Sequence, residues 1–235
     1  MASQRFNRND DLIVENHPKS PIAEAFRSIR TSLNYLDPDN PIKTLLITSS
    51  KESEGKSLIT TNLALTVAQN NKKVIIIDAD MRKPMQHRFF DMTNFSGLSN
   101  ILMHEISFEE GLRKTQYENI SLISTGVIPP NPAELLDSNS MDDVIKKAKE
   151  SADMIFIDAP PVSPVTDAAL LSKKTDGVLM VVASHETDKE LLKSSIKKLE
   201  FVNANIIGTV LNKYPLEKNS SYNKYYYYYG SNEKM

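Results

Sequence analysis

The feature that most constrains the fold is a series of short, fully apolar runs that alternate with segments of helical period. An apolar run without polar alternation predicts a strand buried on both faces, as in a parallel sheet covered by helices on each side. The pattern therefore predicts an α/β domain with a mostly parallel sheet and helices on both faces. The expected buried strands are 43–48, 74–77, 120–124, 154–157, 177–183 and 205–211.

The segments between these strands carry apolar residues three and four positions apart, which predicts helices that pack on the sheet. We expect helices over residues 58–70 and 133–151, the second with a break near 137–140. A further helix is expected from Pro21 to Leu36, because proline is favoured in a first helical turn and an apolar stripe follows it. This helix precedes the first strand of the sheet.

Composition argues against a nucleic-acid-binding, a disulfide-bonded or a membrane-spanning protein. The chain has 235 residues, a net charge of −2 and no cysteine. We expect no nucleic-acid partner, because there is no overall basic field, and no disulfide or thiolate–metal site. No apolar stretch approaches the roughly 20 residues that a membrane-spanning helix needs, and the N-terminus has no signal-peptide core. We therefore expect a cytoplasmic protein without a transmembrane segment.

The chain divides into three parts on these patterns. Residues 1–20 form a polar lead-in, and residues 21–213 hold the whole predicted domain, with the N-terminal helix included. Residues 214–235 form a tail that we expect to be flexible. The tail contains a cluster of six tyrosines, which contributes little to a buried core. These are Tyr222, Tyr225, Tyr226, Tyr227, Tyr228 and Tyr229.

A phosphate-binding motif follows the first strand. Residues 50–57 have the spacing GxxxxGK[ST], with Ser50 in place of the first glycine. A strand before this motif and a helix after it are the context in which it cradles phosphates, through backbone N–H groups and the helix N-terminus. Lys56 would reach the β and γ phosphates, and the Ser57 hydroxyl would ligate Mg²⁺. The alternative is an ordinary polar loop with a chance Gly-Lys-Ser. The expected nucleotide contacts are Ser53, Glu54, Gly55, Lys56, Ser57 and Leu58.

Two of the expected strands run directly into an aspartate. Asp78 and Asp158 end them, and Asp80 follows two residues after Asp78. Carboxylates at the carboxyl ends of parallel strands lie on the edge of the sheet that binds ligands, where they can face Mg²⁺ directly or through water. We expect a metal site formed by Ser57, Asp80 and Asp158. The alternative for a single member, above all Asp80, is that it only caps the next helix.

Three further polar residues keep two interpretations each. Lys51 is either a second lysine directed at phosphate or a solvated loop charge. Arg82 either steadies phosphate or packs the loop. On the N-terminal helix, Glu24, Arg27 and Arg30 lie three residues apart and form one polar row. By spacing alone this row is a solvated face with local ion pairs.

The motifs together are similar to those of the bacterial tyrosine kinases, a family unrelated to eukaryotic kinases. Residues 75–82 match its Walker A′ motif, an apolar triplet followed by D-x-D-x-R, and residues 155–161 match its Walker B motif. Residues 126–136 (GVIPPNPAELL) resemble another recurrent stretch. Glu24, Arg27 and Arg30 match the family's E-x-x-R-x-x-R oligomerisation pattern, and the tyrosine cluster matches its autophosphorylation tail. The resemblance covers nearly the whole chain.

The resemblance implies a P-loop NTPase fold and an ATP- and Mg²⁺-dependent kinase that phosphorylates tyrosines of its own tail and of other proteins. It implies a ring-shaped homo-oligomer, such as an octamer, with phosphorylation between subunits. It also implies a separate membrane-anchored activator or adaptor that recruits the kinase to the inner face of the membrane, and a role in capsular or exopolysaccharide synthesis and export. As in related P-loop ATPases, Asn212 would hydrogen-bond adenine, unless it only turns the chain.

The implied mechanism assigns catalytic roles to Lys56, Asp78, Asp80 and Asp158. Asp78 is the candidate that orients the tyrosine hydroxyl and accepts its proton. The alternatives are that Asp78 and Asp80 exchange roles, or that both act through metal-bound water. Two other functions compete with this one. The first is an ATPase switch of the partition or septum-site type, and the second is a nucleotide-sensing subunit that transfers no phosphate.

Overall fold

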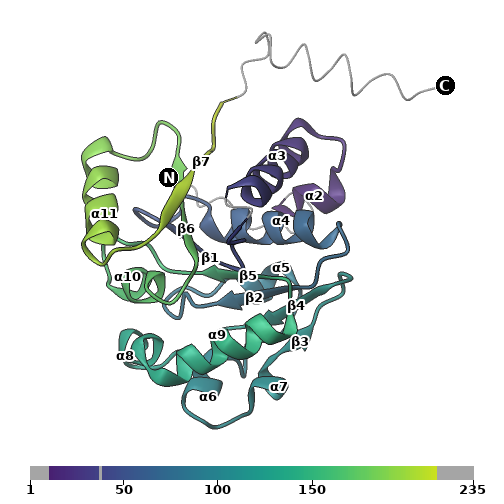
Figure 1. Cartoon of the computed structure of the whole chain (residues 1–235), viewed down its shortest axis with the longest axis vertical. Helices are drawn as coiled ribbons and strands as arrows, with labels where there is room; N and C mark the ends of the chain where they lie inside the picture. Colours follow the sequence, from purple (N-terminus) through teal and green to yellow (C-terminus); the bar gives the residue numbers. More distant parts are fainter. Residues whose placement is uncertain (1–10, 37–38, 216–235) are drawn as a thin grey trace, which may run out of the picture.

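The computed structural model describes residues 11–36 and 39–215, and within them a seven-stranded sheet forms the centre (Figure 1). Its strand order is β3-β4-β2-β5-β1-β6-β7, and every neighbouring pair is parallel except β3 with β4. The strands are β1 (Thr44–Ser49), β2 (Val74–Asp78), β3 (Arg113–Lys114), β4 (Ile120–Ile123), β5 (Met154–Asp158), β6 (Gly177–Ala183) and β7 (Ile206–Asn212).

Helices cover both faces of the sheet, as Figure 1 shows for α2, α3 and α4 on one side and α6 to α9 on the other. The first layer holds α2 (Ile13–Asn16), α3 (Pro21–Tyr35), α4 (Lys56–Ala68) and α5 (Gln86–Phe89). The second layer holds α6 (Leu98–Leu102), α7 (Phe108–Gly111), α8 (Pro132–Asp137), α9 (Asn139–Ser151), α10 (Asp167–Ser172) and α11 (Lys189–Phe201).

The sheet confirms the predicted fold class and explains why the strands read as continuous apolar runs. In β1, Leu45 and Ile47 pack into the first layer while Leu46 packs into the second. Because successive side chains of a strand point to opposite faces, a strand between two helical layers needs apolar residues at every position. The helix break expected near 137–140 is present, since α8 ends at Asp137 and α9 begins at Asn139.

The strand expected over 205–211 is present as β7, but the prediction that it is buried was wrong. β7 is the last strand in the sheet order, and its residues alternate between partly buried and exposed from Gly208 onward. Leu211 leaves more than half of its surface exposed. Its apolar composition resembles that of a central strand. The strand order shows that β7 is an edge strand, with β6 as its one neighbour in the described sheet.

The N-terminal segment contains an element that the sequence did not predict. α2 is a single turn, and the side chains of Leu12 and Val14 are fully buried in the first layer. Asn62 of α4 fixes this turn, because its Oδ1 accepts the N–H of Val14 at 3.0 Å. The expected helix after it is present as α3, where the Ser20 hydroxyl accepts the N–H of Ala23. Part of the polar lead-in therefore packs on the domain.

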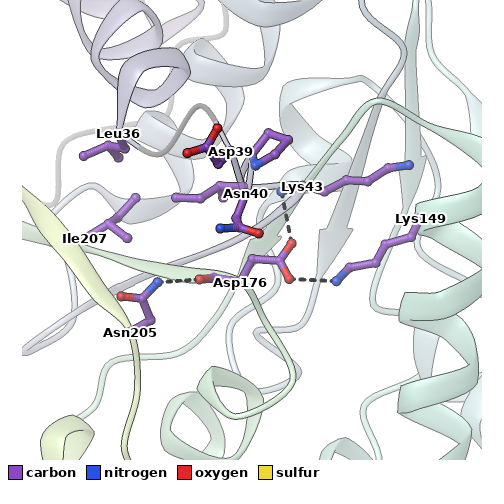
Figure 2. A pocket seen from close by; sticks show the side chains of 10 residues that line it. Leu36, Asp39, Asn40, Lys43, Lys149, Asp176, Asn205 and Ile207 are labelled. Atoms are coloured by element: carbon purple, nitrogen blue, oxygen red, sulfur yellow. Dashed lines mark hydrogen bonds and ion pairs between the residues drawn. The ribbon is translucent and has the colours of Figure 1, made fainter.

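Asp176, directly before β6, joins the start of β1, the helix α9 and the segment before β7 (Figure 2). Its carboxylate accepts the N–H groups of Lys43 and Thr44 at 3.0 and 2.8 Å and pairs with the ammonium of Lys149 at 2.8 Å. Asn205, before β7, donates its amide to the carbonyl of Asp176. Burial opposes ionisation, but the hydrogen bonds from Lys149, Thr44 and Lys43 outweigh it and hold the pKa of Asp176 below its ordinary value.

We expect Asp176→Ala to lower the free energy of unfolding at pH 7 by about 1–3 kcal/mol, because two backbone donors and Lys149 lose their acceptor. A carboxylate with a lowered pKa stabilises the fold above its unfolded-state pKa and loses this effect as the pH falls through the folded-state value. Urea titrations at pH 7 should show a lower free energy of unfolding for Asp176→Ala than for the parent protein. This difference should disappear when the titrations are repeated in acid. An equal loss for Asp137→Ala, at the exposed end of α8, would contradict the role of Asp176.

Candidate functional site

The phosphate loop connects β1 to α4 and has the backbone geometry of a phosphate cradle. Gly55 precedes the first residue of α4 with φ of 94°, and Ser53 has φ of 64°. A Cβ atom on Gly55 would lie 2.1 Å from Nδ2 of Asn212, so position 55 needs glycine for its φ and for this close approach. The loop follows β1, which lies between β5 and β6 in the sheet. The connections after β1 and after its neighbour β6 go to opposite faces of the sheet, and open α/β sheets bind ligands at such a point.

Glu54 holds this loop from inside. Its side chain is buried, and Oε2 accepts the N–H groups of Ser50 and Lys51 at 2.7 and 3.0 Å. The hydroxyl of Thr187, in the loop between β6 and α11, hydrogen-bonds the other carboxylate oxygen. Asn212 donates its amide to the carbonyl of Glu54 at 2.9 Å. The sequence indicated Glu54 only as a backbone contact, and the structure adds this side-chain role.

Lys56 lies among carboxylates at the start of α4. Its Nζ is 2.7 Å from Oδ2 of Asp80, 3.5 Å from Oδ1 of Asp158 and 3.3 Å from the hydroxyl of Ser57. Burial lowers the pKa of Lys56, but the charges of Asp158 and Asp80 outweigh burial and raise the pKa above its ordinary value. The loop therefore holds a positive charge beside the amides that the sequence predicts to bind phosphate.

Asp78 and Asp158 lie side by side because the register of β2 and β5 pairs them directly. Both side chains are fully buried, and Oδ1 of each has no hydrogen-bond partner in the described structure. Burial raises the pKa of both carboxyls, that of Asp78 further through the charge of Asp158, whereas the ammonium of Lys56 opposes the shift at Asp158. Buried carboxylate oxygens without partners are costly, and a cation or a proton donor would satisfy them.

Gln86 at the start of α5 is the site residue that the sequence did not reveal. Its Nε2 donates to Oδ2 of Asp158 at 2.8 Å and to the carbonyl of Ser57 at 3.1 Å, and its Oε1 accepts from the hydroxyl of Thr61. Its backbone N–H donates to Oδ2 of Asp78. A fully buried glutamine therefore fixes Oδ2 of each carboxylate, while Oδ1 of Asp78 accepts no hydrogen bond in the described structure and Oδ1 of Asp158 faces the ammonium of Lys56 at 3.5 Å. A lone glutamine after Met85 carries no sequence signal for this role.

Asp80 does not cap the helix that follows it, which begins at Gln86 with Met85 before it, and its predicted role as a metal ligand stays a prediction. Its Oδ1 accepts the N–H groups of Arg82 and Lys83 at 3.3 and 2.9 Å, which closes the turn after β2, while Oδ2 pairs with Lys56. Arg82 packs the same turn, because its guanidinium forms two hydrogen bonds with buried Asp167 at 3.0 and 3.1 Å. This pair connects the turn to the first residue of α10.

The donor set fits a nucleotide with a hard cation but does not form a metal site by itself. Within residues 11–36 and 39–215, no group of three or more His, Cys, Asp or Glu is arranged to hold a metal ion. Ser57, Asp80 and Asp158 converge on Lys56, and Oδ1 of Asp158 accepts no hydrogen bond in the described structure. A metal held there would need phosphate oxygens or water to complete an octahedral shell. Such partial sites are usual for Mg²⁺ bound together with phosphates.

The remaining predicted residues lie elsewhere. Lys51 donates to the carbonyl of Glu186, in the loop that also contacts Glu54. Arg27 pairs with Glu24 at 2.8 Å on α3, and Arg30 donates to the carbonyl of Thr66 near the end of α4 opposite the phosphate loop. The predicted interface row thus has partners within its own chain. The tail tyrosines lie outside the described residues.

The chain is similar to P-loop NTPases and to bacterial proteins named as tyrosine kinases. A family model described as "ParA: NUBPL iron-transfer P-loop NTPase" matches residues 41–235. The chain is 40% identical to "Putative tyrosine-protein kinase CapB" of Staphylococcus aureus over 93% of this chain and 95% of that one. It is 36% identical to tyrosine-protein kinase YwqD of Bacillus subtilis (strain 168), with 98% and 95% coverage.

A solved structure shows the same fold as this chain. The crystal structure of the chimerical protein CapA2B2 superimposes with a TM-score of 0.85 and 38% identity, over 91% of this chain and 92% of that one. Among the helices that the structure describes, none is long and apolar enough to span a bilayer.

Proposed function

Because this chain belongs to the bacterial tyrosine-protein kinase family of P-loop NTPases, we propose that it transfers the γ-phosphoryl group of ATP to tyrosines of its own C-terminal tail. Membership of this family establishes that the chain is a tyrosine kinase with a nucleotide-binding P-loop. The choice of the tail as acceptor rests on one observation. β7 ends at Asn212, whose amide contacts the phosphate loop through Glu54, so the tail begins beside the nucleotide site.

We infer that ATP and Mg²⁺ are the natural ligands. Lys56 and the amides from Ser53 to Leu58 hold the phosphates, and Lys56 moves its charge from Asp80 to the phosphate oxygens. Ser57, Asp80 and Asp158 hold the metal. Bound Mg²⁺ supplies charge neutralisation on the transferred group. Asn212 remains the candidate for adenine recognition.

Asp78 is the candidate that accepts the proton of the tyrosine hydroxyl. Its Oδ1 is buried and lacks a partner, whereas Oδ2 is fixed by the N–H groups of Met85 and Gln86. Oδ1 of Asp80 is held by two backbone N–H groups and its other oxygen is assigned to the metal, which favours Asp78 for this role. In the step, the phenolic oxygen forms a bond to the γ-phosphorus and its proton passes to Asp78. The bond between the γ-phosphorus and the bridging oxygen breaks, and ADP leaves.

We expect Gln86→Leu to weaken binding of the Mg²⁺–ADP complex by about 10–100-fold, because Oδ2 of Asp158 loses the side-chain amide that orients it, whereas the backbone N–H that Asp78 accepts is kept. Calorimetric titration with Mg²⁺–ADP, repeated with ADP in EDTA, separates the metal-dependent part from nucleotide binding alone. Gln69→Leu, at the exposed end of α4, is the matched control. Equal Mg²⁺–ADP affinity for the Gln86 and Gln69 variants would show that Gln86 only fills space.

We propose a ring of subunits, such as an octamer, in which Glu24, Arg27 and Arg30 contact a neighbour and each tail enters the next subunit's site. A separate membrane-anchored activator recruits the ring to the inner face of the membrane, where it regulates capsular or exopolysaccharide synthesis. The description of a solved relative as a chimerical protein supports a partner chain. Other protein tyrosines are further substrates.

Tail phosphorylation is expected to loosen this oligomer. Each phosphate adds about −1.5 to −2 charges, and a phosphorylated tail is repelled by Asp78, Asp80 and Asp158. Light scattering at low salt should give a lower mass for phosphorylated protein than for unmodified Lys56→Met at the same concentration. The difference should shrink above about 0.1 M salt, where exposed charges are screened over about 10 Å. Equal masses at low salt would contradict the switch.

Phosphotyrosine mapping after incubation with ATP and Mg²⁺ tests the proposed function. Phosphate on Tyr222 or on the 225–229 run is the expected result. Release of inorganic phosphate without phosphotyrosine would favour an ATPase switch of the partition or septum-site type. Nucleotide binding with neither product would favour a nucleotide-sensing subunit.

A further inference from the structure

The ion pair between Arg82 and Asp167 has no part in the proposed function. Asp167, the first residue of α10, is fully buried, and its two carboxylate oxygens accept hydrogen bonds from Nε and Nη2 of Arg82 at 3.0 and 3.1 Å. A carboxylate that binds a guanidinium through two nitrogens fixes the orientation of that group as well as its position. Because a buried charge is costly unless it is paired, Asp167 keeps Arg82 in this place.

The ion pair joins the turn after β2 to a segment that is held against the phosphate loop. Arg82 belongs to that turn, and Asp167 follows the segment after β5, the strand that lies between β2 and β1 in the sheet. In this segment the N–H groups of Val162 and Ser163 donate to the carbonyls of residues 49 and 50 at 2.8 and 3.2 Å. Both partners of the ion pair therefore lie at the carboxyl edge of the sheet, where the phosphates are expected.

The guanidinium of Arg82 keeps one nitrogen without a hydrogen bond. Its Nη1 donates to no group within residues 11–36 and 39–215, and the side chain is 42% exposed although that of Asp167 is fully buried. The backbone N–H of Arg82 donates at 3.3 Å to Asp80, whose other oxygen pairs with Lys56 at 2.7 Å. An accessible N–H donor therefore extends from the same turn that holds the lysine of the phosphate loop.

We propose that Asp167 is a positioning residue that directs the free Nη1 of Arg82 at an oxygen of the phosphoryl group during its transfer. This inference rests on the proposed function and adds a group to the same site. Negative charge spreads over the equatorial oxygens of a phosphoryl group in transfer, and a guanidinium held beside them stabilises that charge. Arginine suits this task because it binds a carboxylate with two nitrogens and still has a third for phosphate.

The competing role of the ion pair is to pack the turn and nothing else. A residue that only packs the turn changes stability, nucleotide binding and phosphoryl transfer together. A contact made only in the transition state changes the transfer rate and leaves the binding of Mg²⁺–ADP as it was. Fluoroaluminate bound with Mg²⁺–ADP imitates the phosphoryl group in transfer, so its binding reports on the second role without any acceptor.

The test compares four full-length variants with the parent. Arg82→Met removes the guanidinium, Asp167→Asn keeps the guanidinium but weakens the carboxylate that orients it, and the double variant removes both charges. Arg88→Met, at the exposed end of α5, is the matched control because it removes the same charge elsewhere. Each protein is measured for its single-turnover transfer rate, its melting temperature, and its calorimetric affinity for Mg²⁺–ADP with and without fluoroaluminate.

Arg82→Met should slow transfer by at least about 10³-fold, the effect of losing an arginine that contacts the transferred group. Its affinity for the fluoroaluminate complex should fall by at least about 10²-fold, with Mg²⁺–ADP affinity within a few-fold of the parent. Asp167→Asn should slow transfer by about 10–100-fold, because the guanidinium is less well placed. Arg88→Met should match the parent.

The double variant separates the two roles. Arg82→Met alone leaves Asp167 buried without its cation and should lower the melting temperature, whereas the double variant should melt close to the parent. Its transfer should stay as slow as that of Arg82→Met. Recovery of transfer together with the melting temperature, or parental fluoroaluminate binding by Arg82→Met, would overturn the proposal. A parent that releases phosphate without phosphotyrosine would overturn the proposed function, while the fluoroaluminate affinities would still decide the role of Arg82.

Discussion

Replacement of Lys56 by methionine is expected to reduce tail phosphorylation by at least about 10²–10³-fold, the effect of removing one preorganised charge from a transition state. Lys56 is the cation closest to the predicted phosphate position, and its Nζ is held between Asp80 and Asp158. Methionine keeps much of the side-chain volume and removes the charge. Quantitative phosphotyrosine detection on protein from a host without tyrosine kinases measures the effect.

The same substitution is also expected to lower the stability of the fold, so a control has to separate this loss of stability from the loss of activity. Without Lys56, two buried carboxylates lose their cation, and we expect a lower melting temperature together with an unchanged circular dichroism spectrum. Lys56→Arg keeps the ion pair but places a bulkier group in the loop, so it should recover stability more than activity. Lys72→Met, in the exposed turn after α4, should retain both. Phosphotyrosine on folded Lys56→Met protein would remove this lysine from the mechanism.

Asp78→Asn is expected to slow phosphoryl transfer by about 10²–10⁴-fold, the usual contribution of a positioned general base. An amide occupies the same space and still accepts the N–H groups of Met85 and Gln86 through one oxygen, but it cannot take the tyrosine proton. Affinity for Mg²⁺–ADP should therefore change only by a few-fold. Single-turnover rates and calorimetric affinities on the same sample separate the two effects.

The pH dependence gives Asp78 a second test. Because burial and Asp158 raise the pKa of Asp78 above its ordinary value, the transfer rate should fall with decreasing pH well before an exposed aspartate would be protonated. This decline should be absent from the residual activity of Asp78→Asn and present in Asp137→Asn, a control at the exposed end of α8. Near-normal transfer by Asp78→Asn would assign the base to another group.

The parts of the fold that the sequence predicted depend on local patterns. Apolar runs such as 74–77 and 154–157 identified central strands, and the aspartates that end them lie side by side because parallel strands end at one edge of the sheet. Gly55 was recognisable from its place in the phosphate-binding motif. The motif requires glycine there because the position has a positive φ and no room for a Cβ atom. These features are set by residues close together in the chain.

The features that the sequence missed depend on contacts between distant residues. Gln86 matters because α5 places its amide between Ser57 and Asp158, and the partners are 29 and 72 positions away. Arg82 kept two interpretations because its partner Asp167 lies 85 positions further along. β7 was predicted to be buried because an apolar run does not reveal whether the strand pairs with another strand on both sides or on one. Only the assembled sheet supplies this information.

The fate of the γ-phosphoryl group in a mixture of two chains tests the central claim most directly. One chain is full-length Lys56→Met with an intact tail, and the other has an intact site and serine at every tail tyrosine. After incubation with γ-labelled ATP and Mg²⁺, we expect label on the tail tyrosines of the Lys56→Met chain, and loss of that label when the partner also carries Asp78→Asn. Label recovered only as inorganic phosphate, with none on tyrosine, would contradict the assignment of this site as a tyrosine kinase that acts on its own tail.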